Sequence, residues 1–127
     1  MIAFLGLDEP ISAPSLAPLA PSIDREHLSR MTLGERDLER EVLALFDRQA
    51  DMLLARMRKA TPAVAAAAAH TLKGSARGIG AWQVASAAEA VELAVVGPEA
   101  EFKALLGALS AAVNEAKAAI AELLRAN

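Results

Sequence analysis

Apolar residues at three- and four-residue spacing recur along most of the chain after residue 33, and this pattern constrains the fold more than any other feature. It is strongest between residues 99 and 125. Its members there are Phe102, Leu105, Leu106, Leu109, Val113, Ala116, Ile120, Leu123 and Leu124. Such spacing places side chains on one face of an α-helix, and that face has to be buried. The segment therefore predicts a long helix that packs through one side.

Residues 33–59 show the same periodicity. The positions expected to face the core are Leu38, Val42, Leu45, Phe46, Leu53 and Met57. Thr32 followed by Glu35 has the form of a capping box, in which the two side chains bond the first free amides of a helix. This helix is therefore predicted to begin at residue 33.

Two further helices are predicted between these segments. Thr61 and Pro62 form a start signal, because proline is favoured at the first helical position. Gly80 is the expected left-handed residue that ends this helix near residue 79. The next helix covers about residues 81–96 and ends at Gly97 and Pro98. Its expected inward residues are Val84, Ala88, Val91 and Val95.

Short loops between long helices make consecutive helices antiparallel neighbours. The chain is therefore predicted to be all-α, with an antiparallel up-down-up-down four-helix bundle in a domain over residues 22–127. A short additional N-terminal helix over residues 24–31, capped by Ser22 or Asp24, is expected across one end or side of the bundle. Its apolar edge consists of Ile23, Leu28 and Met31.

Residues 1–21 are proline-rich. Four of the six prolines of the chain lie there: Pro10, Pro14, Pro18 and Pro21. This spacing excludes a regular helix, so a flexible N-terminal segment is expected. A docking arm or tether is the alternative to a simple mobile terminus.

Composition narrows the classes of function. The chain has 127 residues, enough for one domain, and 13 basic against 16 acidic residues give a net charge of −3. Neither nucleic acid nor a membrane is therefore indicated as a partner. The absence of cysteine excludes disulfides and thiolate chemistry. No apolar run approaches the roughly 18 residues of a membrane span, and no signal peptide is recognised, so a cytoplasmic location is expected.

The segment from His70 to Gly80 carries the chemistry. At 100° per residue, five residues lie within about 60° of His70 on a helix: Ala66, Ala67, Lys73, Gly74 and Arg77. The far side, which is expected to face the core, carries Ala65, Ala68, Leu72, Ser75 and Ile79. His70 is therefore predicted to project into solvent between two cations. The other histidine, His27, is expected to be an ordinary surface residue, because two histidines without nearby carboxylates form no metal site.

An exposed imidazole is a competent nucleophile near neutral pH. Lys73 and Arg77, one and two turns further on, could neutralise the oxygens of a phosphoryl group on that ring. Glycine within a helix costs about 0.5–1 kcal/mol against alanine, so Gly74 indicates a need for close approach. A phosphoryl-accepting histidine that meets another protein's active site has these requirements.

The string His-Thr-Leu-Lys-Gly-Ser-Ala-Arg, followed by Ile-Gly-Ala at residues 79–81, resembles the signature of histidine-phosphotransfer (HPt) domains of two-component phosphorelays. The signature has Lys-Gly-Ser three to five residues after the histidine, here ending at Ser75, and a glycine ten residues after it, here Gly80. Gly78 is a mild departure, because an asparagine or similar residue is common there. The resemblance spans roughly residues 20–125 and implies the bundle fold.

The resemblance implies that His70 is phosphorylated and relays the phosphoryl group between receiver-domain aspartates. It also places Glu92 beside the histidine, where some members carry a glutamine that bonds the ring. The implied partners are response-regulator receiver domains and a hybrid histidine kinase. No cofactor is expected on this chain, and Mg²⁺ is expected on the receiver. Without a nucleotide-binding loop, the protein is expected to be a monomeric phosphocarrier without kinase activity of its own.

The expected docking face is the exposed side of the helix around His70, together with parts of the helices predicted over residues 24–31 and 33–59. Ala66, Ala67 and Gly74 make it flat, and Ile23 and Leu28 are its hypothetical apolar contacts. Three alternatives remain: a receiver-binding adaptor without chemistry, the dimerisation domain of a sensor kinase, and a purely structural bundle. The intact His70 motif disfavours the first, and the lack of an ATP-binding domain in the sequence disfavours the second.

Overall fold

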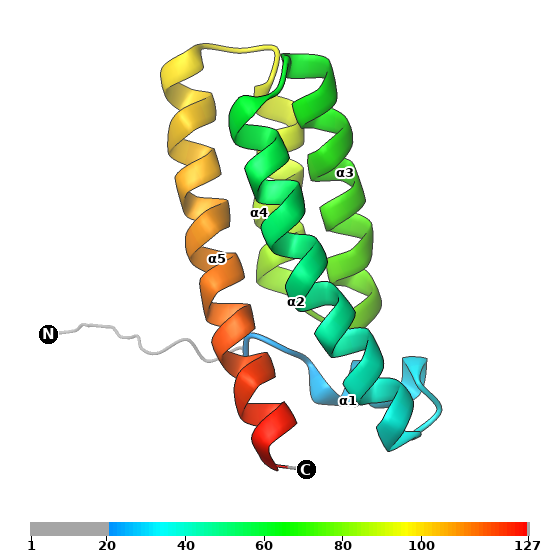
Figure 1. Cartoon of the computed structure of the whole chain (residues 1–127). Helices are drawn as coiled ribbons and strands as arrows, with labels where there is room; N and C mark the ends of the chain where they lie inside the picture. Colours follow the sequence, from blue (N-terminus) through cyan, green and yellow to red (C-terminus); the bar gives the residue numbers. More distant parts are fainter. Residues whose placement is uncertain (1–20, 127) are drawn as a thin grey trace, which may run out of the picture.

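The computed structural model describes residues 21–126, which contain five helices (Figure 1). They are α1 (Arg25–Met31), α2 (Arg36–Lys59), α3 (Pro62–Ile79), α4 (Trp82–Ala94) and α5 (Glu99–Ala126). Most of the predicted N-terminal proline-rich segment, residues 1–20, lies outside this described part, as does Asn127.

The four long helices form a bundle in which each one packs against two others. Helix α3 contacts α2 and α4, and α5 contacts the same two helices from the opposite side. Figure 1 shows the α2–α3 and α4–α5 connections at one end of the bundle and α1 at the other. The predicted all-α four-helix bundle with a short additional helix is confirmed.

The middle of the apolar stripe of α5 is buried as predicted, with Leu109, Val113 and Ile120 in the core. The stripe residues nearer its two ends are partly buried against this core: Phe102, Leu105, Leu123 and Leu124. On α3 and α4 many of the buried residues are alanines, including Ala69, Ala76 and Ala88, whereas α2 contributes mostly large side chains. Small side chains let helices approach closely, which explains how a chain with 3% aromatic residues fills its interior. Helix α5 also has the length and apolar composition of a membrane span, but here its apolar face packs within the bundle.

Two predicted core residues of α2, Leu38 and Leu45, are instead 40% and 54% exposed. The face that is buried is marked by Leu43, Ala50 and Leu54 together with the expected Phe46, Leu53 and Met57. On a helical wheel, Leu38 and Leu45 fall at the margin of this face and point outward. The prediction for them was wrong because the apolar stripe of α2 is wider than the surface that its neighbours cover.

The predicted capping box is also wrong. Helix α2 begins at Arg36, and Glu35 makes no side-chain capping bond. The buried hydroxyl of Thr32 donates instead to the Leu28 carbonyl at 2.9 Å, which closes the end of α1. The turn between the two helices uses positive φ angles at Leu33 (57°) and Gly34 (74°).

Gly80 ends α3 with a φ of 79°, as predicted. The Ala81 amide donates to the Ala76 carbonyl at 2.8 Å, which is the pattern of a helix closed by a left-handed residue. A β-carbon on Gly80 would lie 2.8 Å from the Asp24 carbonyl oxygen. The Asp24 amide also donates to the Gly80 carbonyl at 2.9 Å, so this glycine joins α1 to α3.

Candidate functional site

His70 lies near the middle of α3 on its outer face, with 67% of its side chain exposed. The preceding Ala69 and the nearby Leu72 and Ala76 are completely buried, and they fix the rotation of the helix. Because core packing sets this rotation, the outward direction of the histidine is a consequence of the apolar pattern. The sequence-based expectation for His70 is met.

The imidazole is held by a carboxylate from the neighbouring helix. Nδ1 of His70 lies 3.0 Å from Oε2 of Glu92 on α4, and the Lys73 ammonium donates to Oε1 of the same carboxylate at 2.9 Å. The lysine hydrogen bond is the main cause that lowers the pKa of Glu92 below its ordinary value; the histidine contributes in the same direction, and partial burial opposes both. Glu92 is therefore a carboxylate at neutral pH.

This geometry defines the form of the ring. A carboxylate oxygen only accepts hydrogen bonds, so Nδ1 of His70 is the nitrogen that carries the proton. In the neutral imidazole, the lone pair is then on Nε2. Among the described residues, Glu92 is the hydrogen-bond partner of this ring. Because the bond engages Nδ1, Nε2 lies on the other side of the ring, away from Glu92. The ring is thus oriented as a nucleophile.

The two predicted cations differ in their surroundings. The Lys73 side chain is only 13% exposed, because it lies along the bundle and reaches Glu92. The Arg77 guanidinium is 54% exposed and lies 4.0 Å from Glu89 of α4, at the limit of an ion pair. Such an exposed pair is weak, so Arg77 can turn toward an anion at little cost. Lys73 instead positions the carboxylate that holds His70.

The surface next to His70 is low, in the sense that its side chains are small and do not project beyond the helix. Gly74 is exposed, and a β-carbon there would meet no atom within 4 Å, so nothing in the fold requires glycine at this position. Ala67 is exposed and Ala66 is half-buried on the same face. The structure therefore brings together the residues predicted to give a partner close access to the ring.

Ser75 lies toward α2, where its hydroxyl donates to Oε1 of Gln49 at 2.9 Å. This bond fixes one side of α2 against α3 within a turn or two of His70. Gln49 was not predicted from the sequence, and no local pattern around it indicates this contact.

Ile23 and Leu28 do not belong to the exposed surface. They are only 3% and 2% exposed, because α1 folds over the end of the core and buries them. The prediction that they contact a partner was therefore wrong. Exposed apolar side chains are found instead on α2 at Leu38, Leu45 and Met52, the last being 53% exposed. Their seven-residue spacing was visible in the sequence as a second, outward stripe.

His27 is not the ordinary surface residue that was predicted. Its Nε2 donates to the Arg77 carbonyl at 2.9 Å, and its ring lies 4.8 Å from that of Trp82 between centroids. The Trp82 indole donates to Oδ2 of Asp24 at 2.9 Å, and this bond is the main cause that lowers the pKa of Asp24. Together these bonds attach α1 to the end of α3.

Fold and site thus define a helical bundle that presents an oriented, exposed histidine. The family model described as Hpt domain matches residues 41–126, which is most of the chain. The protein therefore belongs to the Hpt domain family, whose role is histidine phosphotransfer in two-component signalling together with receiver domains. No match was found among curated proteins or among solved structures.

Proposed function

We propose that this protein carries a phosphoryl group on His70 between the aspartates of two receiver domains. The observation that carries the proposal is the ring geometry, with Nδ1 bonded to Glu92 and Nε2 left exposed. Membership of the Hpt family supports the type of chemistry. The assignment of the residue is based on the site.

In the first step, the Nε2 lone pair attacks the phosphorus of a receiver's aspartyl phosphate. An N–P bond forms, the bond between phosphorus and the aspartate oxygen breaks, and the receiver recovers its carboxylate. The ring gains positive charge as the bond forms, and the Glu92 carboxylate at Nδ1 stabilises that charge. In the second step, the carboxylate of another receiver attacks the same phosphorus, and the lone pair returns to Nε2.

The remaining residues serve positioning and charge. Arg77 is the exposed cation that can pair with phosphoryl oxygens, whereas Lys73 holds Glu92 in place. Mg²⁺ is contributed by the receiver, because phosphoryl transfer depends mainly on alignment and charge neutralisation at the transferred group. The protein functions as a cytoplasmic monomer that receives its phosphoryl group through a hybrid histidine kinase and its receiver.

The receiver docks on the surface formed by α2 and α3 beside His70. Gln49 bonds Ser75, and Leu45 and Met52 lie four residues before and three residues after Gln49, on the same side of α2. They therefore border the low surface at Ala67 and Gly74. Exposed apolar residues around a flat centre are typical of a protein interface.

The test uses a phosphorylated receiver domain as donor. The wild-type protein is expected to acquire acid-labile, base-stable phosphate, and His70→Gln is expected to acquire none, whereas His27→Gln is labelled normally. Equal labelling of His70→Gln would exclude the proposed residue. For docking, Leu45→Glu is expected to weaken receiver binding, while Ala111→Glu on the exposed side of α5 leaves it unchanged.

A further inference from the structure

The exposed apolar residues on the outer face of α2 follow a regular spacing. Leu38, Leu45 and Met52 are seven residues apart, and their exposed fractions are 40%, 54% and 53%. Because seven residues make nearly two complete helical turns, the three side chains form one stripe about 21 Å long. Within residues 21–126, α2 packs against α3 and α5, and neither helix covers this stripe.

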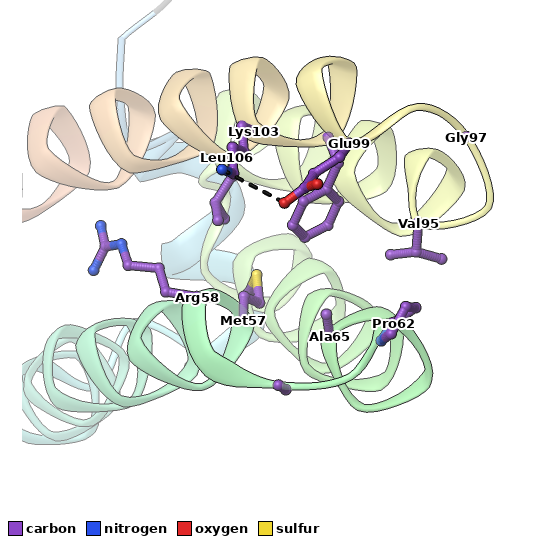
Figure 2. A pocket seen from close by; sticks show the side chains of 11 residues that line it. Met57, Arg58, Pro62, Ala65, Val95, Gly97, Glu99, Lys103 and Leu106 are labelled. Carbon is purple, nitrogen blue, oxygen red and sulfur yellow. Dashed lines mark ion pairs between the residues drawn. The ribbon is translucent and has the colours of Figure 1, made fainter.

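The inner face of α2 is different, because it is occupied within the bundle. Near the end of the helix, Met57 and Leu106 of α5 line a cavity of about 530 Å³ (Figure 2). These two side chains are only 1% and 8% exposed, so the lining already belongs to the core. The apolar surface of α2 that is open to another molecule is therefore the outer stripe.

Charges are divided along the same outer face. Asp37 and Glu41 lie in its first half, whereas Arg48, Arg56 and Lys59 lie in its second half, and all five are exposed. Among the described residues, none of the five takes part in an ion pair. The division suits the dipole of α2 itself, but it also makes the face complementary to an antiparallel copy of itself, since each acidic half then meets a basic half.

A two-fold axis beside Leu45 gives the register of such a pair. Leu45 of the two copies meet at the axis, and Leu38 of each copy meets Met52 of the other, because both lie seven residues from the centre. Glu41 and Arg48 lie on the same side of the stripe, about 40° and 60° from Leu45 around the helix. They are four residues before and three residues after the centre, so the glutamate of one copy lies opposite the arginine of the other.

We propose that two copies of this protein associate through the outer faces of α2. The helices are antiparallel and meet at Leu45, and Glu41 of each copy pairs with Arg48 of the other. The same surface of both copies is used, so the assembly closes at two. Three apolar side chains from each copy make a small interface, and the dissociation constant is therefore expected to be on the order of 100 μM.

The effect of this dimer on phosphotransfer rests on the proposed function. Leu45 and Met52 border the surface on which the receiver is proposed to dock, so a second copy and a receiver exclude one another. The monomer is then the form that transfers the phosphoryl group, and the dimer is a resting form.

Charge reversal tests the dimer without any receiver. In sedimentation velocity between about 10 μM and 1 mM, the wild-type protein is expected to shift from monomer towards dimer. Glu41→Arg and Arg48→Glu each place like charges across the axis, so each variant alone is expected to bind itself about tenfold more weakly or less. A mixture of the two variants restores both ion pairs and is expected to form a mixed dimer. Glu115→Arg, on the exposed side of α5, is the control that associates like the wild type.

A wild-type protein that stays monomeric at about 1 mM would overturn the proposal. Full association of both single variants, or a mixture that associates no better than its components, would also overturn it. Excess receiver is expected to dissociate the dimer, and a complex that contains both contacts would overturn the competition between them. Absence of phosphate on His70 in dilute protein would reject the proposed function instead, and the sedimentation result would be unaffected.

Discussion

The two histidines of this protein have opposite surroundings: His70 lies on α3, and His27 lies on α1 against the end of α3. His70 is bonded through Nδ1 to a carboxylate, and 67% of its side chain is exposed. His27 is bonded through Nε2 to the Arg77 carbonyl, and its ring packs against Trp82. The nitrogen that is engaged therefore distinguishes a ring available for reaction from a ring that joins two helices.

The partners differ in kind as well. A carboxylate stabilises the positive charge that a ring acquires on phosphorylation, whereas a main-chain carbonyl offers only a neutral dipole. The contrast shows that exposure of a histidine is only part of the requirement for phosphotransfer. Four measurements test this contrast between the two histidines, and they are given in order from the largest expected effect to the smallest.

Gly74→Leu is expected to slow phosphotransfer by about 100-fold, because a branched side chain beside His70 keeps the receiver from aligning with Nε2. The fold should not suffer, since a β-carbon added to Gly74 would have no atom within 4 Å. Gly107→Leu on α5 is the matched control, with equally open space. Transfer rates from a phosphorylated receiver provide the measurement, and equal rates for both variants would contradict the proposed approach.

Glu92→Ala is expected to slow transfer by about tenfold or more, because a hydrogen bond to a charged group contributes about 1.5–3 kcal/mol. Glu92→Gln keeps an acceptor for Nδ1 and should retain more activity. The ¹⁵N chemical shifts of His70 report the tautomer directly. Wild-type protein is expected to show Nδ1 protonated near neutral pH, and a loss of this preference is expected only in the alanine variant.

His27→Gln is expected to reduce the free energy of unfolding by about 0.5–1.5 kcal/mol, the net value of a typical hydrogen bond, while phosphotransfer continues. The bond to the Arg77 carbonyl and the contact with Trp82 are weakened or lost in this variant. Chemical denaturation and the transfer assay together test the separation. A strong loss of transfer at full stability would give His27 a part in the reaction.

The smallest effect concerns acid stability. Glu92 has a pKa below its ordinary value of 4.5, chiefly because Lys73 bonds it, and Asp24 has one below 3.8, chiefly because Trp82 bonds it. Each carboxylate thus contributes stability that is fully present above the ordinary value and is lost as the pH falls through the lower, folded-state pKa. In urea denaturation at a series of pH values, Glu92→Gln should flatten the decline in unfolding free energy below about pH 4.5, and Asp24→Asn should flatten it below about pH 3.8.

Local sequence signals predicted the helices well. The stripe of α5, the proline at the start of α3 and the left-handed Gly80 all act over a few residues, so they survive in any tertiary setting. The errors lie at the edges of elements. Thr32 had two possible roles, as the cap of α2 or in closing α1, and the buried Leu28 carbonyl decided between them.

Surface assignments were harder than core assignments. Ile23 and Leu28 looked like an exposed apolar edge because α1 is short, and their burial depends on where that helix lies on the bundle. The reverse holds for Leu45, which has the right type and spacing for a core residue but lies beyond the reach of α3. Residue type and helical periodicity do not determine which part of a wide apolar stripe the neighbouring helices cover.

The sequence by itself determined the number of helices, their approximate ends and the outward direction of His70, because each depends on residues within a few positions of one another. Only the tertiary structure decided the bonds of Glu92 to His70 and Lys73, the attachment of His27 and the cavity at the far end of the bundle. These join residues of different helices. The rotation and register of packed helices result from the packing of the whole core at once, and no single segment of the sequence determines them.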